Sequence, residues 1–278
     1  MSVVLALLAS LSWGFADFGA GVASRRLPVF VVALLVQFFG LLVALFVVLV
    51  TQPSTPSTQQ FAWAAFAGAI GLVGIASFYH ALSVGTMGIV GPITATASVV
   101  PVAYGLARGE RPSALQGLGV GLAVVGVIAA SIEREHDDAP VRLGAGVGFA
   151  LLAALSFGGS LIGLSRAAGG GVAWGVLTMR LAAFPLVLLI VLFVGPRVVP
   201  GRRAWLLLAF VGAADTGATL LYGAASTRGL LSVVAVLSSL YPIVIVVLAR
   251  ILLGERIARP QLAGVAVALT GVALISAG

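Results

Sequence analysis

Two carboxylates stand in surroundings that disfavour them. Asp17 and Asp215 each lie within a stretch of more than fifteen otherwise uncharged, mostly apolar residues. A charge at the centre of a lipid bilayer costs roughly 2.5–3.5 kcal/mol even on the most lenient insertion scale. Such a group must therefore face a partner or a water-filled cavity, and the two aspartates indicate a pathway for a solute or for protons.

Asp215 begins a polar stripe. Asp215, Thr219, Tyr222 and Ser226 stand at i, i+4, i+7 and i+11, which is one face of a helix. The stripe predicts a cavity wall with a protonatable carboxylate, since burial disfavours the ionised form of a carboxyl group. The alternative is a buried aspartate that binds a neighbouring helix for a structural reason, and the default for intramembrane ionisable residues favours the first interpretation.

Asp17 belongs to a second mixed face. Ser10, Trp13, Asp17 and Gly21 share a helical face, with Gly14 beside them. A carboxylate attracts a cationic group, and an indole ring stacks on a ring or a cation, so this face suits an amphipathic organic solute. The alternative places Asp17 near the membrane interface, paired with one of the two arginines that follow its helix.

The remaining candidates are scattered along the chain. Arg180 lies about eight residues inside an apolar span, where we expect an ion pair with an aspartate or a contact with a solute carboxylate; the alternative is snorkelling to the interface. A lone histidine such as His80 more often packs than relays protons. The candidate solute-binding or coupling residues are Ser10, Trp13, Asp17, Gln37, Tyr79, His80, Arg180, Asp215, Thr219, Tyr222 and Tyr241, and the candidate helix-breaking residues are Pro101 and Pro242.

The elements that must position these residues are membrane helices. The chain has 278 residues, of which 61% are hydrophobic and only 8% charged, against about 25% charged residues in soluble domains. About 20 apolar residues cross the hydrocarbon core as a helix. The sequence predicts ten such spans, at 2–23, 28–50, 60–82, 86–107, 113–131, 143–165, 172–194, 204–226, 230–252 and 259–277.

The two halves of the chain repeat each other. Gly109-Glu110-Arg111 matches Gly254-Glu255-Arg256 at an offset of 254 − 109 = 145, and Gln37 is the approximate counterpart of Arg180, since 180 − 37 = 143. The repeat predicts a first five-helix unit over 1–132, a charged linker over 133–142 and a second unit over 143–278. Because five is odd, the second unit enters the membrane inverted, and such transporters bind solutes near the midplane between the repeats.

These motifs resemble those of a known family. Trp13-Gly14, the run Pro101 … Gly109-Glu110-Arg111 … Gln116 … Gly119, and its second copy Tyr241-Pro242 … Leu253-Gly254-Glu255-Arg256 … Gln261 … Gly264 are similar to the EamA family of the drug/metabolite transporter superfamily. Arg180 also occupies a position where that family often has arginine. One departure is that Pro101 precedes Glu110 by 9 residues, whereas Pro242 precedes Glu255 by 13 (110 − 101 and 255 − 242).

The resemblance implies an all-α membrane protein with ten helices, in two inverted five-helix repeats around a central cavity. It implies a secondary transporter, an exporter of small organic metabolites such as amino acids or amphipathic drug-like compounds, that works by alternating access in the inner or plasma membrane. Proton coupling through Asp17 or Asp215 and an uncoupled facilitator with structural carboxylates both stay open. So does the choice between a monomer and a weak homodimer.

Several classes are disfavoured. The sequence has no P-loop, no H-E-x-x-H and no cysteine, and nothing has metal-ligand spacing, so we expect neither an enzyme nor a cofactor nor a metal site. The net charge of +7 comes from arginines in short loops, where they contact lipid headgroups, and we expect no nucleic-acid partner. Orientation is ambiguous, because the family resemblance implies cytoplasmic termini and the arginine distribution implies the reverse.

Overall fold

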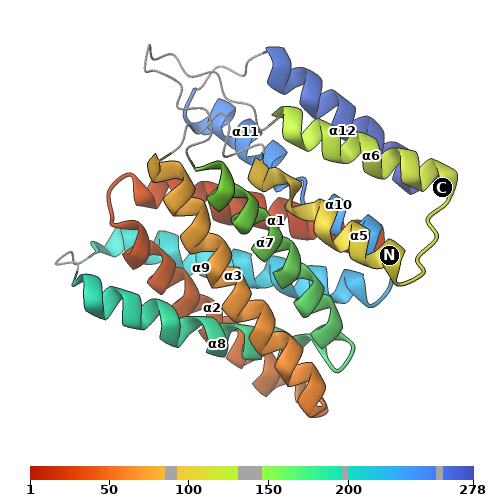
Figure 1. Ribbon diagram of the computed structural model, residues 1–278. Coiled ribbons are helices and arrows are strands. Elements are labelled where there is room, and N and C mark those ends of the chain that lie inside the picture. Colours follow the sequence, from red (N-terminus) through yellow and green to blue (C-terminus); the bar gives the residue numbers. More distant parts are fainter. Residues whose placement is uncertain (85–92, 131–145, 196–199, 255–258) are drawn as a thin grey trace.

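The computed structural model describes residues 1–84, 93–130, 146–195, 200–254 and 259–278. Every regular element in these residues is a helix (Figure 1). The first repeat contains α1 (Ser2–Ser24), α2 (Val29–Thr51), α3 (Thr58–Val84), η1 (Thr96–Ser98), α5 (Val99–Ala107) and α6 (Ala114–Ala130). The second contains α7 (Val147–Ala168), α8 (Val172–Val194), α9 (Arg202–Ser226), α10 (Leu231–Ser238), α11 (Tyr241–Leu252) and α12 (Arg259–Ala277). The predicted linker 133–142 lies outside the described residues.

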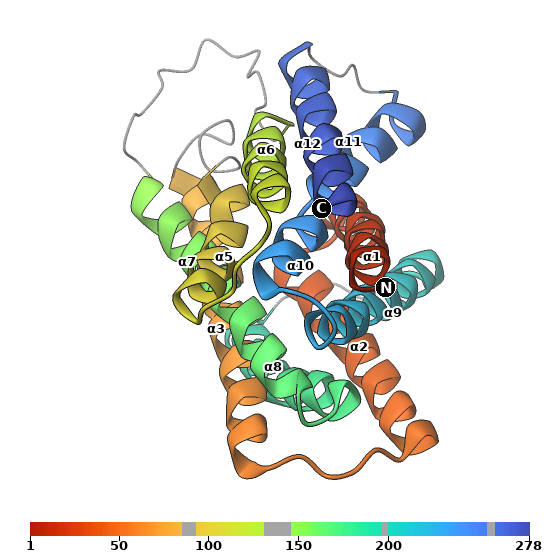
Figure 2. The same cartoon turned by 90° about the vertical axis from the view of Figure 1, so that its right-hand side faces the viewer.

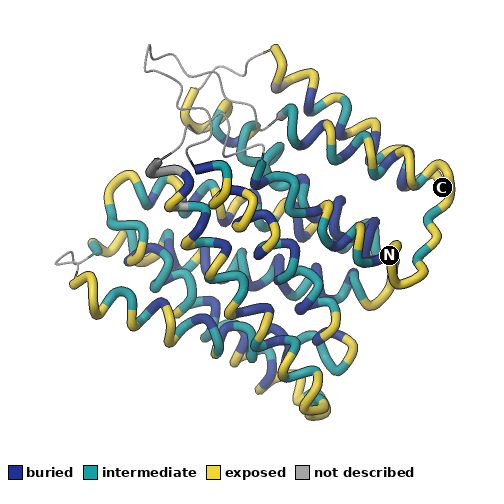
Figure 3. The backbone as a smooth tube through the Cα atoms, viewed as in Figure 1, coloured by how far each residue is buried: buried dark blue, intermediate teal, exposed yellow. Residues whose placement is uncertain are grey.

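The helices are long and apolar enough to cross a bilayer. Seven segments of the described chain qualify by length and hydropathy, α10 and α11 together counting as one, and three shorter apolar helices cover 93–107, 114–129 and 262–275. The apolar outer faces of these helices are exposed, as lipid-facing surfaces must be (Figure 3). The two chain ends lie on one side of the molecule (Figure 1). The predicted all-α fold of ten spans is confirmed.

We call this side the termini face; it also carries the turn 108–113 between α5 and α6 and the turn 227–230 before α10. The opposite face carries the turn 25–28 after α1 and the start of α9 at Arg202.

Helix contacts follow the symmetry of an inverted repeat. α1 packs along α9, and its counterpart α7 packs along α3; likewise α2 contacts α9 as α8 contacts α3. The last helices of the two repeats, α6 and α12, lie side by side at one edge of the molecule (Figures 1 and 2). Each of these helix pairs therefore joins the two repeats, and the space between them is an inter-repeat interface.

Glycine permits the closest of these contacts. A Cβ on Gly14 of α1 would overlap Val244 of α11, and a Cβ on Gly158 of α7 would overlap Val100 of α5. These two contacts are equivalent, because 158 − 14 and 244 − 100 both equal 144. Small residues let membrane helices approach until their backbones nearly touch. Gly14 and Gly158 therefore set how close the first helix of each repeat comes to the broken span of the other repeat.

Two spans are interrupted before a proline. The fourth span changes from the short 3-10 turn η1 to α5, in which Pro101 is the third residue. The ninth span breaks at Ser239 and Leu240 between α10 and α11, where Pro242 is the second residue. Proline fits the first turn of a helix, where its missing N–H is not needed, so in both spans it begins a new helical segment.

Candidate functional site

A buried arginine is the centre of the polar cluster. Arg180 lies on α8 with its side chain 5% exposed. Its Nη2 donates to Oδ2 of Asp215 on α9 at 2.5 Å, and to Oγ1 of Thr219 at 3.4 Å. Its Nη1 donates to Oε1 of Gln37 on α2 at 2.6 Å. The guanidinium is thus neutralised by a carboxylate of its own repeat and solvated by an amide of the other repeat, as a buried charge requires.

Both oxygens of Asp215 are engaged. Oδ2 accepts from Arg180, and Oδ1 accepts from the indole Nε1 of Trp13 on α1 at 3.1 Å. The Asp215 backbone oxygen also accepts from the Thr219 hydroxyl, at 2.7 Å. The Asp215 side chain is thus held by two donors, one of them cationic, which come from α1 and α8.

The contact between Gln37 and Arg180 locates the cluster. These residues occupy equivalent positions in the two repeats, since 180 − 37 = 143. Two equivalent residues of an inverted repeat touch only close to the pseudo-two-fold axis, which runs in the plane of the membrane. The cluster therefore lies at the centre of the inter-repeat interface and near the mid-depth of the spans.

Gly40 makes room for this arrangement. A Cβ at Gly40 of α2 would lie 2.6 Å from Oγ1 of Thr216 and 3.4 Å from Nε and Cζ of Arg180. Thr216 is fully buried. Among the described residues neither its hydroxyl nor the Nε of Arg180 has a hydrogen-bond partner. The guanidinium is therefore held between α2 and α9 by shape as well as by hydrogen bonds.

Asp17 is placed differently. It is exposed, and among the described residues its carboxylate has no hydrogen-bond or ion-pair partner. The lipid-facing stripe of α1 is Val4, Leu8, Leu11 and Phe15, all between 39% and 56% exposed. Asp17 follows Phe15 by two residues, or about 200° around the helix, so it points away from that stripe. Its negative charge is felt by Tyr241 of α11, and it is repelled by Asp215.

The inner face of α1 becomes more open along its length. Ser10 is buried, Trp13 is partly buried and Asp17 is exposed, while a Cβ on Gly21 would meet nothing within 4 Å. On the sides of α1 that point away from the lipid-facing stripe, exposure therefore increases towards the end of the helix at Asp17 and Gly21. This end of α1 lies at the face opposite the termini.

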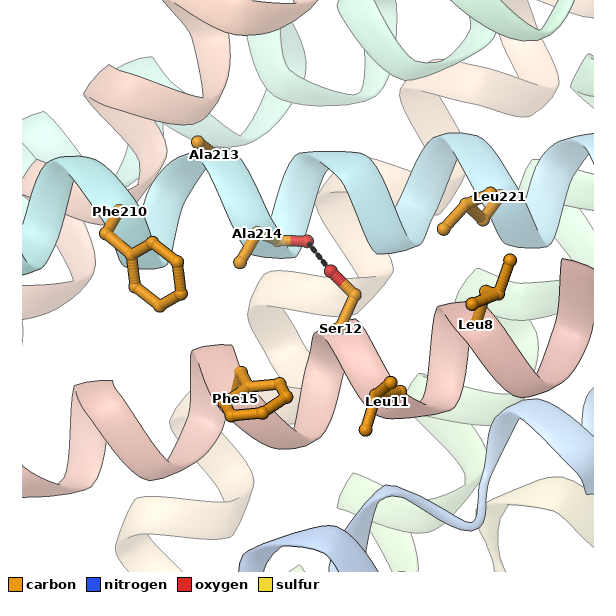
Figure 4. Close-up of a pocket in the computed structure, with 8 residues that line it drawn as sticks. All are labelled: Leu8, Leu11, Ser12, Phe15, Phe210, Ala213, Ala214 and Leu221. Atoms are coloured by element: carbon orange, nitrogen blue, oxygen red, sulfur yellow. Dashed lines mark hydrogen bonds between the residues drawn. The ribbon is translucent and has the colours of Figure 1, made fainter. Parts of the chain in front are cut away.

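A groove on the outer side of α1 provides a contrast. It has a volume of about 450 Å³ and lies between α1 and α9, lined by Leu8, Leu11, Ser12, Phe15, Phe210, Ala213, Ala214 and Leu221 (Figure 4). The Ser12 hydroxyl donates to the Ala214 backbone oxygen at 2.8 Å across its floor (Figure 4). No charged group lines it. The polar chemistry of α1 and α9 therefore lies on their inner faces.

The other candidate residues lie at different distances from the cluster. Thr219 belongs to the cluster, and Tyr241 stands at the break of the ninth span near Asp17. Tyr222 is fully buried beside Trp13, with ring centroids 5.9 Å apart, and its hydroxyl donates to the Leu161 backbone oxygen. His80 packs edge-on against Phe149 of α7 at 4.2 Å. The side chain of Tyr79 lies outside the described part of the structure. A solute-binding role for each of these residues stays a prediction.

The family model for EamA-like transporters matches residues 1–132 and 144–277. This chain belongs to the EamA-like transporter family. Among solved structures, 29 chains match, and one titled "Crystal structure of protein" shares 19% identity over 98% of this chain and 95% of that chain, with a TM-score of 0.81. At that identity the likeness shows the fold alone. The comparison with curated proteins found no match. The protein is thus a multi-pass membrane transporter and not an enzyme.

Sequence reasoning missed two parts of this EamA-like transporter's cluster. Gly40 and Thr216 carry no charge, and nothing in the sequence sets Thr216 apart from other polar residues in the spans. A signal did exist for Gly40, because it lies three residues after Gln37, on the same helical face. The sequence offset likewise identified Gln37 and Arg180 as counterparts in the two repeats, but it did not show that their side chains are in contact.

Proposed function

We propose that this EamA-like transporter moves small amphipathic organic solutes that carry one positive charge, and that it exchanges them for protons at Asp17 by alternating access. The observation that carries the proposal is the contrast between the two carboxylates. Asp215 binds Arg180 through one oxygen and Trp13 through the other, whereas Asp17 is exposed and has no hydrogen-bond or ion-pair partner within the described ranges.

The charges of the site favour a cation. Arg180 and Asp215 compensate each other, and in the part of the chain that the structure describes the charged group left near the cluster is the carboxylate of Asp17. Either a proton or an organic cation neutralises it, and the two exclude each other on one carboxylate. A site of this kind exchanges one for the other, because the ionised form alone is costly within the membrane.

The surroundings favour an amphipathic cation over a zwitterion or an anion. The Trp13 indole and the Tyr241 ring lie near Asp17, and aromatic faces attract cations and apolar rings alike. A solute carboxylate would need Arg180, whose two terminal nitrogens already bind Asp215 and Gln37. We therefore rank organic ammonium compounds above amino acids, and both above organic acids.

Direction and location follow the family resemblance. We propose export across the inner or plasma membrane, with the inward proton gradient as the source of energy. Among the described residues, the titratable groups nearest Asp17 are Asp215 of α9, which is paired with Arg180 of α8, and Tyr241 of α11. Neither Asp215 nor Tyr241 is cationic, which leaves the Asp17 carboxylate available to a proton or to a cationic solute.

A matched series of probes tests the proposal. Proteoliposomes that contain a pH-sensitive dye receive phenethylamine, phenylalanine or hydrocinnamate, which share one skeleton and differ in charge. We expect phenethylamine to move protons in the opposite direction, phenylalanine to do so weakly and hydrocinnamate not at all. Asp17→Asn should abolish the proton signal while the protein stays folded.

Three outcomes contradict the proposal. Flux of phenethylamine that ignores an imposed pH gradient identifies an uncoupled facilitator. A preference for hydrocinnamate shows that Arg180 and not Asp17 recognises the solute. Full pH-dependent exchange by Asp17→Asn shows that the proton is carried elsewhere.

A further inference from the structure

The turn between α5 and α6 binds the start of a helix in the other repeat. Oε1 of Glu110 accepts from the backbone N–H of Leu231 at 2.7 Å. Oε2 accepts from the backbone N–H of Ser232 at 3.0 Å and from its hydroxyl at 2.7 Å. The carboxylate therefore satisfies donors at the N-terminus of α10 that have no partner within the helix, where a negative charge is also favoured by the helix dipole.

The turn is shaped to hold the carboxylate in this place. Gly109 has φ of +91°, a conformation that glycine adopts without strain, and the next backbone N–H, of Glu110, donates to the Gly105 oxygen at 3.0 Å. Gly105 has no Cβ, and one added there would overlap the Glu110 carboxylate. The side chain thus lies across Gly105 and reaches α10 from a fixed base.

The bound helix closes the termini face. All eight residues of α10 are buried, in contrast to α11, whose last turn is exposed. α10 lies between α5 and α1 (Figure 2). The turn before it presses on the start of α1, since a Cβ at Gly229 would lie 2.6 Å from Oγ of Ser2. On the opposite face Asp17 is exposed and Gly21 borders open space. The structure is therefore tightly packed around α10 at the termini face, whereas the end of α1 at the opposite face is exposed.

We propose that Glu110 is a latch that holds the termini face closed, and that its release from α10 is required for that face to open. This inference rests on the proposed alternating access. The three hydrogen bonds join the two repeats at the membrane edge, and α10 cannot move away from α5 without leaving the carboxylate and its donors unpaired. The latch thus stabilises one access state relative to the other without touching the solute.

Thiol labelling measures the two access states in the full chain, which has no cysteine of its own. Val234→Cys reports on the termini face, because Val234 is fully buried in α10. Gly21→Cys reports on the opposite face. Glu110→Gln keeps the shape of the side chain and removes its charge. Arg111→Gln is the control, since it removes a charge from the next, exposed position of the same turn.

We expect the Glu110→Gln substitution to raise the labelling rate of Val234→Cys about tenfold or more. This is the change in the equilibrium between access states that loss of one charge-assisted hydrogen bond gives. The same substitution should slow labelling of Gly21→Cys, while Arg111→Gln changes neither rate. If Glu110→Gln does not fold, Ser232→Ala removes one of the three donors and should produce a smaller shift in the same direction.

The reciprocal change separates a latch from a merely structural contact. Faster labelling at both reporters indicates loosening of the fold and overturns the proposal, as do unchanged rates at both. Labelling requires no transported solute. A reciprocal shift in a protein that fails the proton-exchange assay would therefore support the latch and reject the proposed solute chemistry, whereas proton exchange with no shift would do the opposite.

Discussion

Removing the charge of Asp215 tests the electrostatics of the cluster most directly. In Asp215→Asn the guanidinium of Arg180 keeps an amide oxygen beside Nη2 and keeps Gln37 at Nη1, but it loses its counter-charge. Because Arg180 is 5% exposed and Asp215 23%, water can compensate the lost carboxylate only in part. We expect the variant to be destabilised as a protein with an uncompensated buried charge.

The magnitude follows from the geometry. Breaking a buried ion pair by removing one partner costs about 3–5 kcal/mol, and the partial exposure of Asp215 together with the retained Gln37 bond favours the lower end. About 3 kcal/mol corresponds to a fall in the unfolding midpoint of about 6–12 °C for a chain of this size. The double variant Arg180→Gln with Asp215→Asn removes both charges and should recover most of that loss.

Thermal unfolding in detergent, followed by tryptophan fluorescence, measures all four members of this double-mutant cycle. The expected pattern is a large loss for each single variant and a small one for the double variant. Losses that simply add, or an Asp215→Asn variant as stable as the parent, would refute the claim that the pair neutralises a desolvated arginine.

Three further predictions concern Asp17 and the close contacts between helices. Asp17→Asn should leave the unfolding midpoint unchanged or higher, since it removes a carboxylate that Asp215 repels, even though proton exchange is lost; a clear fall in the midpoint would indicate a structural partner for Asp17. Gly40→Ala should cost about 1–3 kcal/mol by overpacking against the arginine, whereas Gly117→Ala, where a Cβ meets nothing within 4 Å, should gain up to about 1 kcal/mol; equal effects of the two would contradict the packing argument. Gly158→Ala should lower stability by a similar 1–3 kcal/mol through contact with α5, measured in the same assay, and a neutral result would mean that α7 and α5 can separate at little cost.

The fold could be predicted because membranes constrain sequences strongly. Every backbone group must be bonded within a span, so apolar runs of sufficient length become helices. The span boundaries that fall on described residues lie within a few residues of those predicted, whereas the predicted start of the fourth span, at 86, lies outside the described residues. The repeat offset then fixed the pairing of the two halves without any knowledge of contacts. The match of Glu110 and Arg111 with Glu255 and Arg256 was one of the main observations that defined this offset.

The site was predicted only as a set of residue types. A charged residue within an apolar span is easily recognised in the sequence, and Asp17, Arg180 and Asp215 are three of the few such residues. Which aspartate pairs with the arginine could not be predicted, because the choice depends on how α1, α8 and α9 meet across the interface. The capping of α10 by Glu110 was hidden for the same reason, since the two segments are 121 residues apart.

The meeting of Gln37 and Arg180 on the pseudo-symmetry axis has a consequence for how such a duplicated protein can change. A residue beside that axis faces its counterpart in the other repeat. If both copies of a duplicated gene encoded arginine at this position, two cations would lie against each other in a buried site. One copy therefore had to carry a different side chain at this position, so the residues beside the axis are those at which the two repeats must differ in charge. Exchanging the two side chains, Gln37→Arg with Arg180→Gln, keeps that difference and reverses which repeat carries the positive charge. Asp215 would then have to pair with an arginine of the other repeat, across the interface.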